Sequence, residues 1–190
     1  MFDTPLIEFF SRIHPITPFL FWLPISAGLL WVSLRQGIGS LSAVGLFFCG
    51  WIAWSLTEYL LHRFVFHWLA SAPWRRRFHF IFHGVHHDFP NDDRRLVMPL
   101  GVSIPIFLVV FIPCSALMGI PISCAAMSGF GVGYLAYDGV HYFTHHMPAR
   151  SRLAKFLKRY HMVHHFTGHE AKWGVSSPLW DGVFRSVEQR

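Results

Sequence analysis

The chain has 190 residues, of which 53% are hydrophobic and only 14% are charged. This is too apolar for an ordinary soluble domain, and the length allows one domain, residues 1–190. The formal net charge of +6 is compatible with nucleic-acid binding, but basic residues also gather beside phospholipid headgroups. We therefore expect an integral membrane protein with no nucleic-acid partner.

Uncharged stretches predict where the chain crosses the bilayer. No Asp, Glu, Lys or Arg occurs between Arg12 and Arg35, between Arg35 and Glu58, or between Arg95 and Asp138. A spanning helix needs about 20 apolar residues, so the first two stretches hold one span each. The third is about twice as long and has a turn signal at 119–121, so it holds two. The sequence thus predicts an all-α fold with four transmembrane helices, at about residues 14–34, 40–61, 98–118 and 121–140.

The distribution of basic residues predicts the orientation of these spans. Of the sixteen Lys and Arg residues, only Arg35 lies in a loop on the side opposite the termini. By the positive-inside rule, both termini and the segments 62–95 and 141–190 face the cytoplasm. We expect a multi-pass protein of a bacterial inner membrane, or of the endoplasmic reticulum membrane in a eukaryote.

Most histidines fall into four groups. Isolated histidines form hydrogen bonds within cores, whereas many imidazoles collected together repel when protonated and gain little when neutral, unless a cation binds them. The groups therefore predict a two-metal site with ligands from several helices. Ten of the 14 histidines belong to it: His62 and His67, then His83, His86 and His87, then His141 and His145, and finally His161, His164 and His165.

The second span should continue beyond the bilayer, because Trp54, Glu58 and His62 recur every four residues on one helical face. His67 follows His62 by five residues, which is off that face. We therefore expect a distortion of the helix, or a turn, between the two histidines.

Two further helices should carry the remaining groups. Pro73, with Ser71 as a candidate cap, should begin an interfacial helix that leads to His83, His86 and His87, and Gly84 should ease close approach of backbone or metal there. The fourth span brings His141 and His145 out of the bilayer. After Pro148, Ser151 should cap an amphipathic helix that forms a lid, with ligand histidines on its buried face and Arg152, Lys155 and Arg159 largely opposite.

Other polar residues near the groups are candidates for supporting the ligands. Glu58, Asp138 and His79 are expected to lie behind the ligands, where a carboxylate fixes an imidazole tautomer by accepting its second N–H. Asp88 and Asp181 suit this role or a helix cap equally. His14 and His146 fit interfacial or hydrogen-bonding roles, and His169 fits the entrance to the site. No catalytic residue beyond the metal ligands is expected.

About five imidazoles for each of two metals would leave one open position in a six-coordinate shell, whereas a structural zinc site is closed with four ligands. Imidazole accepts iron, zinc, copper or nickel, so the ligands alone do not select the metal. A site at the ends of lipid-facing helices suits an acyl chain, and oxidation of its C–H bonds needs redox chemistry that zinc lacks. A di-zinc hydrolase that works without oxygen is an alternative, and a metal transporter or store ranks last.

Four stretches resemble the histidine boxes of the fatty acid hydroxylase superfamily: EYLLHRFVFH (58–67), FHGVHHD (82–88), YDGVHYFTHH (137–146) and YHMVHH (160–165). RLVMP (95–99) and GVSSPLWD (174–181) resemble the fatty acid 2-hydroxylase branch, and sterol or carotenoid hydroxylases and desaturases remain alternatives. The resemblance covers about Trp51 to Phe184. It implies an O2-dependent di-iron monooxygenase, with the ten histidines as ligands, that hydroxylates carbon 2 of an acyl chain, free or amide-linked in a sphingolipid. Zinc can replace iron in purified members.

The chain departs from these relatives in two places. Many eukaryotic relatives carry a fused cytochrome b5 domain, whereas about fifteen residues precede the first span here. We therefore expect a separate electron donor, a cytochrome b5-like protein or a ferredoxin. Near the end, Arg185 and Ser186 stand where relatives often have Gly-Thr.

Overall fold

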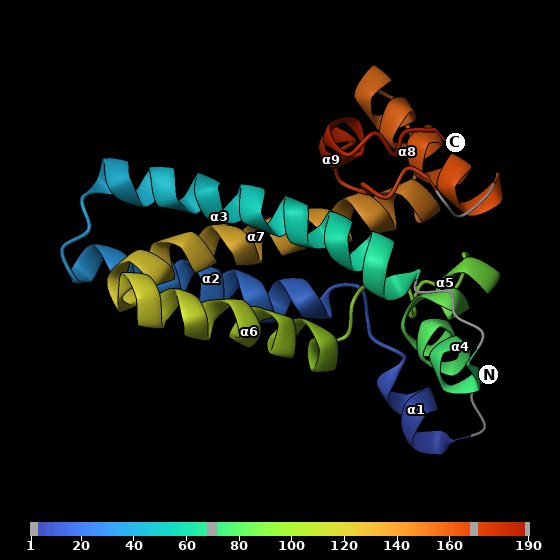
Figure 1. The fold of residues 1–190 in the computed structure, drawn as a ribbon, viewed down its shortest axis with the longest axis horizontal. Helices are drawn as coiled ribbons and strands as arrows, with labels where there is room; N and C mark the ends of the chain where they lie inside the picture. Colours follow the sequence, from blue (N-terminus) through green and yellow to red (C-terminus); the bar gives the residue numbers. More distant parts are fainter. Residues whose placement is uncertain (1–3, 68–71, 168–170, 189–190) are drawn as a thin grey trace. The chain divides into compact units, whose positions relative to one another are not determined.

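In a computed structural model, the chain is described over residues 4–67, 72–167 and 171–188, and these residues form helices and connecting loops without any strand (Figure 1). The helical elements are α1 (Pro5–Phe10), α2 (Thr17–Arg35), α3 (Ser40–Leu60), η1 (Leu61–Phe66), α4 (Pro73–His79), η2 (Phe80–Gly84), α5 (Val85–Asp88), α6 (Leu100–Met118), α7 (Ile120–His146), α8 (Arg152–Phe166) and α9 (Leu179–Val183).

The four long apolar helices predicted from the sequence are confirmed as candidate membrane spans. Among the described residues, four helices are long and apolar enough to cross a membrane: 17–35, 40–66, 100–118 and 120–146. The second and fourth run past their predicted ends at 61 and 140, because each continues as helix into the histidine groups. Pro73 occupies the first turn of α4 as predicted, with Ala72 at the N-cap position, and Ser71 lies outside the described residues.

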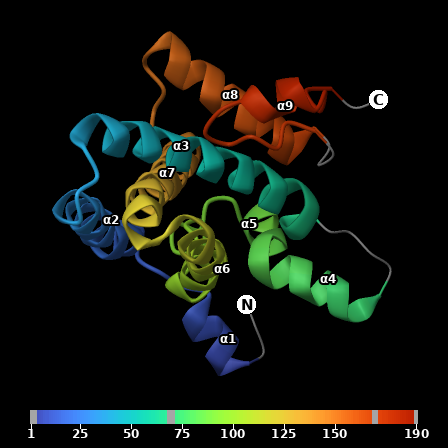
Figure 2. The same ribbon diagram turned by 60° about the vertical axis from the view of Figure 1, so that its left-hand side comes forward.

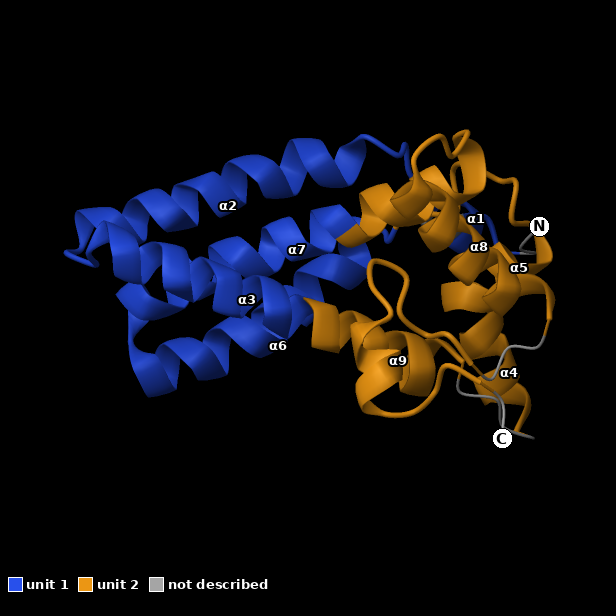
Figure 3. Cartoon of the chain, turned by 90° about the horizontal axis from the view of Figure 1, so that it is seen from above, with its two compact units in different colours: residues 1–54, 98–136 blue, residues 55–97, 137–190 orange. Residues whose placement is uncertain are grey.

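The chain divides into two compact units (Figure 3). The first unit comprises residues 1–54 and 98–136, and therefore α1, α2, α6 and most of α3 and α7. The second unit comprises residues 55–97 and 137–190, and therefore all the predicted metal ligands. Within the second unit, α8 and α9 lie side by side in two views (Figures 1 and 2).

Aromatic side chains form the core of the first unit. The Trp22 indole of α2 donates a hydrogen bond to Ser103 Oγ of α6 at 3.0 Å, and its ring centroid lies 4.7 Å from that of Phe107. The Trp54 ring of α3 packs edge-on against Phe130 and Tyr134 of α7, each at 5.1 Å. Burial of these large rings, with the Trp22 indole N–H satisfied, holds these helices together.

Glycines allow α3 and α7 to touch within the first unit. A Cβ at Gly129 would lie 1.8 Å from the carbonyl oxygen of Phe47, and one at Gly50 would lie 1.7 Å from that of Ala126. Small residues commonly permit such close approach between spanning helices, where van der Waals packing replaces the hydrophobic effect. Any side chain at these positions would force the two backbones apart.

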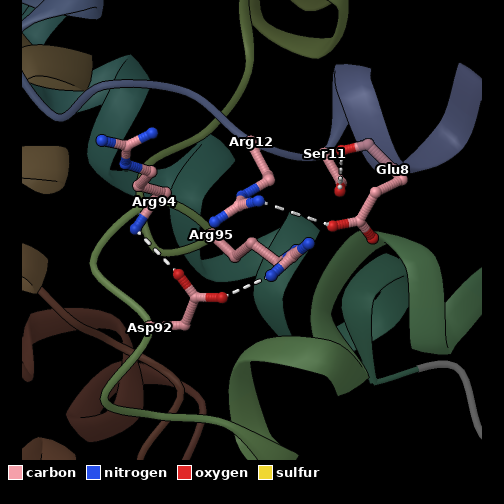
Figure 4. Close-up of polar contacts among 6 residues, drawn as sticks. All are labelled: Glu8, Ser11, Arg12, Asp92, Arg94 and Arg95. Carbon is pink, nitrogen blue, oxygen red and sulfur yellow. Dashed lines mark hydrogen bonds and ion pairs between the residues drawn. The ribbon is translucent and has the colours of Figure 1, made fainter. Parts of the chain in front are cut away.

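Each unit also has a local ion pair (Figure 4). In the first unit, Arg12 lies 3.8 Å from the Glu8 carboxylate, one helical turn away. In the second unit, the Asp92 carboxylate accepts a hydrogen bond from the Arg94 backbone N–H at 3.1 Å and pairs with the Arg95 guanidinium. The Arg95 side chain is only 5% exposed, so Asp92 provides the counter-charge that its burial requires.

Candidate metal centre

The ten histidines predicted as ligands gather into two groups of five, both within the second unit. In each group, one ring nitrogen from every histidine lies within 4.8 Å of the others. We call them the first and second histidine groups. The first contains His62, His67, His83, His87 and His164, and the second contains His86, His141, His145, His161 and His165.

The Nε2 atoms of neighbouring rings have the spacing of ligands on a common ion. In the first group, His83 Nε2 lies 3.1 Å from that of His62 and 3.0 Å from that of His87. In the second group, the corresponding separations range from 2.9 to 3.1 Å. With metal–nitrogen bonds of about 2.1 Å, ligands at right angles lie about 3.0 Å apart and tetrahedral ones about 3.4 Å. The spacing therefore fits an ion with right-angled ligands, as in an octahedral shell.

A π-helical turn joins His62 to His67. The predicted distortion is confirmed: η1 continues α3, and the His67 backbone N–H donates to the His62 carbonyl, five residues back, at 3.2 Å. Because a π turn accommodates one more residue than an α turn, it brings positions five apart to the same side of the helix. The two ring centroids lie 4.9 Å apart.

The two three-histidine segments each contribute to both groups. In η2 and α5, His83 and His87 belong to the first group while His86 belongs to the second. In α8 the arrangement is reversed, with only His164 in the first group. On a helix, the first and third histidines of each segment are four positions apart and point almost the same way. The middle histidine, three positions after the first, points to a different side. Each segment therefore connects two candidate ions.

The spacing of the candidate ligand histidines repeats along the sequence. The four motifs taken one by one did not show this repeat. His67, His83, His86 and His87 are followed 78 positions later by His145, His161, His164 and His165, respectively. His62 is followed 79 positions later by His141. Each histidine of one group therefore corresponds to a histidine of the other group. His86 of the second group corresponds to His164 of the first, and the remaining first-group histidines of the earlier half correspond to second-group ones.

Burial keeps the rings in the form that binds metal. The pKa values of His83, His86 and His161 are lowered well below the usual range, first by burial and then by neighbouring histidines. The same causes lower the pKa values of His67 and His165. Neutral imidazoles have a lone pair to offer to a cation, so the groups suit metal ions at neutral pH.

Backbone carbonyls orient two candidate ligands of the first histidine group. His62 Nδ1 lies 2.5 Å from the carbonyl oxygen of Trp173, and His164 Nδ1 lies 2.8 Å from that of Ala171. A carbonyl only accepts, so each Nδ1 carries the proton and each Nε2 presents its lone pair toward the group. The sequence did not reveal these partners, because any residue type supplies a backbone carbonyl.

The acids near the groups act through the backbone. Glu58 Oε1 accepts from the Val175 and Ser176 backbone N–H groups, both at 2.8 Å. The expectation that Glu58 accepts directly from a ligand is therefore wrong. Asp181 accepts from the Trp173 and Gly174 backbone N–H groups at 2.9 and 2.7 Å, so it is neither a helix cap nor a direct partner of a histidine.

His79 and Asp138 lie close to the ligands. His79 Nδ1 bonds to the carbonyl of Phe66, and its ring lies 5.8 Å from that of His67. A Cβ at Gly84 would lie 3.1 Å from His79 Nε2 and 3.5 Å from the His79 carbonyl oxygen, so Gly84 makes room for close approach of this residue. Asp138 is fully buried in α7, three residues before His141.

The remaining candidates belong to neither histidine group. His14 Nδ1 accepts a hydrogen bond from the Ile16 backbone N–H at 3.3 Å. The His146 ring packs against Tyr142, and Asp88 ends α5. His169 lies outside the described residues.

Four apolar helices and two largely buried histidine groups are typical of a multi-pass membrane protein with sites suited to metal ions. The Fatty acid hydroxylase family model matches residues 47–186, and the chain belongs to this family, whose members are oxidoreductases.

Named relatives and one solved structure agree with this membership. Dihydroceramide fatty acyl 2-hydroxylase FAH2 of Arabidopsis thaliana is 35% identical over 188 residues, which cover 98% of this chain and 78% of the relative. Ceramide very long chain fatty acid hydroxylase SCS7 of Saccharomyces cerevisiae is 38% identical over 170 residues, 86% of this chain and 43% of the relative. A structure of full-length scs7p, with only the hydroxylase domain visible, matches with a TM-score of 0.91 at 33% identity, covering 100% of this chain and 72% of that one.

Proposed function

We propose that the protein hydroxylates carbon 2 of a lipid acyl chain, either of a free fatty acid or of the N-acyl group of a sphingolipid or ceramide. The observation that carries this proposal is the pair of five-histidine groups with Nε2 spacings near 3 Å. The family and the printed names of the relatives, which are fatty acyl and ceramide hydroxylases, supply the substrate class.

The ten histidines would hold two iron ions, five imidazoles to each. Bound iron supplies activation of O2 and attack on an unactivated C–H bond, chemistry that redox-inactive zinc cannot provide even where it occupies the same ligands. Two features of the chain support this centre: burial keeps the rings neutral, and the Trp173 and Ala171 carbonyls orient His62 and His164. Five ligands per ion leave one position of a six-coordinate shell open.

The distribution of basic residues along the chain supports an orientation in the membrane. We propose that residues 1–190 form one membrane domain whose termini and histidine groups face the cytoplasm, in a bacterial inner membrane or the endoplasmic reticulum, with the lipid substrate drawn from the bilayer. A separate donor, cytochrome b5-like or a ferredoxin, would supply electrons. The exposed basic residues Arg152, Lys155 and Arg159 of α8 suit an acidic donor, so the rate of reduction should fall as ionic strength rises.

An isotope experiment tests the reaction. The iron-loaded protein, a reduced donor and a fatty acid or ceramide are incubated under 18O2, and the product is examined by mass spectrometry. We expect one 18O atom at carbon 2, and no product from the zinc-loaded protein. Label drawn from water, a hydroxyl at another carbon, or anaerobic cleavage of an ester or amide would contradict the proposal, and the last would indicate a di-zinc hydrolase.

A further inference from the structure

The chain after α8 folds around one carboxylate, that of Asp181. Asp181 is fully buried, and each of its oxygens accepts a hydrogen bond from a different backbone N–H: Oδ1 from Trp173 and Oδ2 from Gly174. Ser186 Oγ donates to Oδ1 at 2.7 Å and lies 2.9 Å from the Tyr59 hydroxyl. We call residues 171–176 the carbonyl clamp. Its path is fixed by these bonds.

Glu58 holds the other end of the carbonyl clamp. Its Oε1 accepts from the Val175 and Ser176 backbone N–H groups, and its Oε2 accepts from Ser176 Oγ at 2.5 Å. Glu58 is only 4% exposed and lies one helical turn before His62. The helix that supplies the first ligand therefore also supplies an anchor for the clamp.

The backbone of the clamp would not adopt this path on its own. A Cβ at Gly174 would lie 2.1 Å from the carbonyl oxygen of Ser177, and Lys172 has a left-handed φ of 61°. Left-handed backbone is costly for residues other than glycine, so the surrounding hydrogen bonds must impose it. Removing one of the carboxylates should let the segment relax.

The clamp serves one histidine group and not the other. Its Ala171 and Trp173 carbonyls fix His164 and His62, both of the first group. In the second group, several ligands have a buried Nδ1 with no hydrogen-bond partner among the described residues: His86, His141, His161 and His165. The two groups therefore share a ligand pattern but differ in what holds the rings.

We propose that Asp181 and Glu58 are positioning residues for the metal of the first histidine group. They act through the carbonyl clamp, which holds His62 and His164 in the tautomer and orientation that binding requires. The inference rests on the metal centre of the proposed function and assigns a role to two acids that touch no ligand.

Isosteric substitutions of Asp181 and Glu58 should weaken the carbonyl clamp to different extents. In Asp181→Asn, whichever oxygen becomes an amide nitrogen faces a backbone N–H, so one donor must lose its acceptor. In Glu58→Gln, the amide can face Ser176 Oγ, whose hydroxyl can turn and accept, so the effect should be milder. Asp92→Asn is the matched control, because it removes a buried ion pair in the same unit without touching the clamp.

The experiment measures zinc bound by the full-length chain in detergent, by mass spectrometry of the metal after a challenge with chelator. We expect two zinc ions in the wild type and in Asp92→Asn, close to one in Asp181→Asn, and two in Glu58→Gln with one released several-fold faster. Adding His86→Ala, which weakens the second group, should remove the ion that Asp181→Asn retains. Adding His164→Ala to Asp181→Asn should change nothing further.

The outcomes distinguish this inference from the proposed function. Two ions retained by Asp181→Asn at the wild-type release rate would overturn the positioning role and leave the metal centre intact. Loss of both ions in that variant would also overturn it, because the effect would then not be confined to one group. A wild type that takes up no zinc would overturn both proposals.

Discussion

The Nε2 atoms of His164 and His67 lie 3.1 Å apart although the residues are 97 positions apart in the sequence. His161, three residues before His164 on the same helix, belongs to the other histidine group. The direction in which a histidine side chain points, and not its closeness along the sequence, therefore decides which histidine group it joins.

Double substitutions test this grouping. We expect His67→Ala and His164→Ala each to reduce zinc binding by one ion, and the double variant to lose no more than one, since both affect the first group. His67→Ala combined with His161→Ala should lose both ions. A double variant of His67 and His164 that binds no zinc, measured against folded protein by size-exclusion chromatography, would show that the groups are misassigned.

Gly129→Ala should destabilise the first unit. The new Cβ would lie 1.8 Å from the Phe47 carbonyl oxygen, and forced overpacking costs about 1–3 kcal/mol. Gly45→Ala is the control on α3, because a Cβ there meets nothing within 4 Å and alanine is the better helix former by about 1 kcal/mol. Thermal unfolding in detergent should rank Gly45→Ala at or above the wild type and Gly129→Ala below it, and equal midpoints would be inconsistent with the close helix contact.

Arg185→Gly should stabilise the protein. Arg185 has a φ of 55°, which glycine adopts without the steric penalty of a Cβ. After the entropy of glycine in the unfolded chain is subtracted, we expect a gain of about 0.5–1 kcal/mol. Arg185→Ala keeps the Cβ and should gain nothing, so a higher unfolding midpoint in both variants would point to the lost charge instead.

Ser151→Ala should weaken α8, which carries three of the candidate ligand histidines. Ser151 Oγ accepts from the Ala154 backbone N–H at 3.1 Å, and loss of such a cap costs about 1 kcal/mol. Ser151→Asp should preserve stability, because aspartate caps equally well and suits the positive end of the helix. Hydrogen exchange of the first turn of α8 measures the effect, and exchange that is equally fast in both variants would argue against capping.

Local sequence patterns were enough to predict most of the fold. Uncharged length predicted each span, and clustering along the sequence pointed to the ten histidines, because both are properties of short stretches of chain. Ser151 and Pro73 marked helix starts for the same reason, through local backbone chemistry.

Long-range backbone contacts could not be predicted in this way. Glu58 meets Ser176 118 positions later, and the Trp173 carbonyl that orients His62 leaves no trace in residue type. The division of His83, His86 and His87 between two groups was not predicted either, although helical spacing places His83 and His87 on one face and turns His86 aside.

The π turn at Leu61–Phe66 has a consequence for the internal repeat. When the sequence is aligned with itself at the 78-residue shift, one gap is needed, and it falls between His62 and His67. The helix accommodates the additional residue as a π turn, so each candidate ligand histidine from His67 onward stays in register with its counterpart. The π turn thus places His62 and His67, five residues apart, on one side of their helix, as an α-helical turn does for His141 and His145, four residues apart.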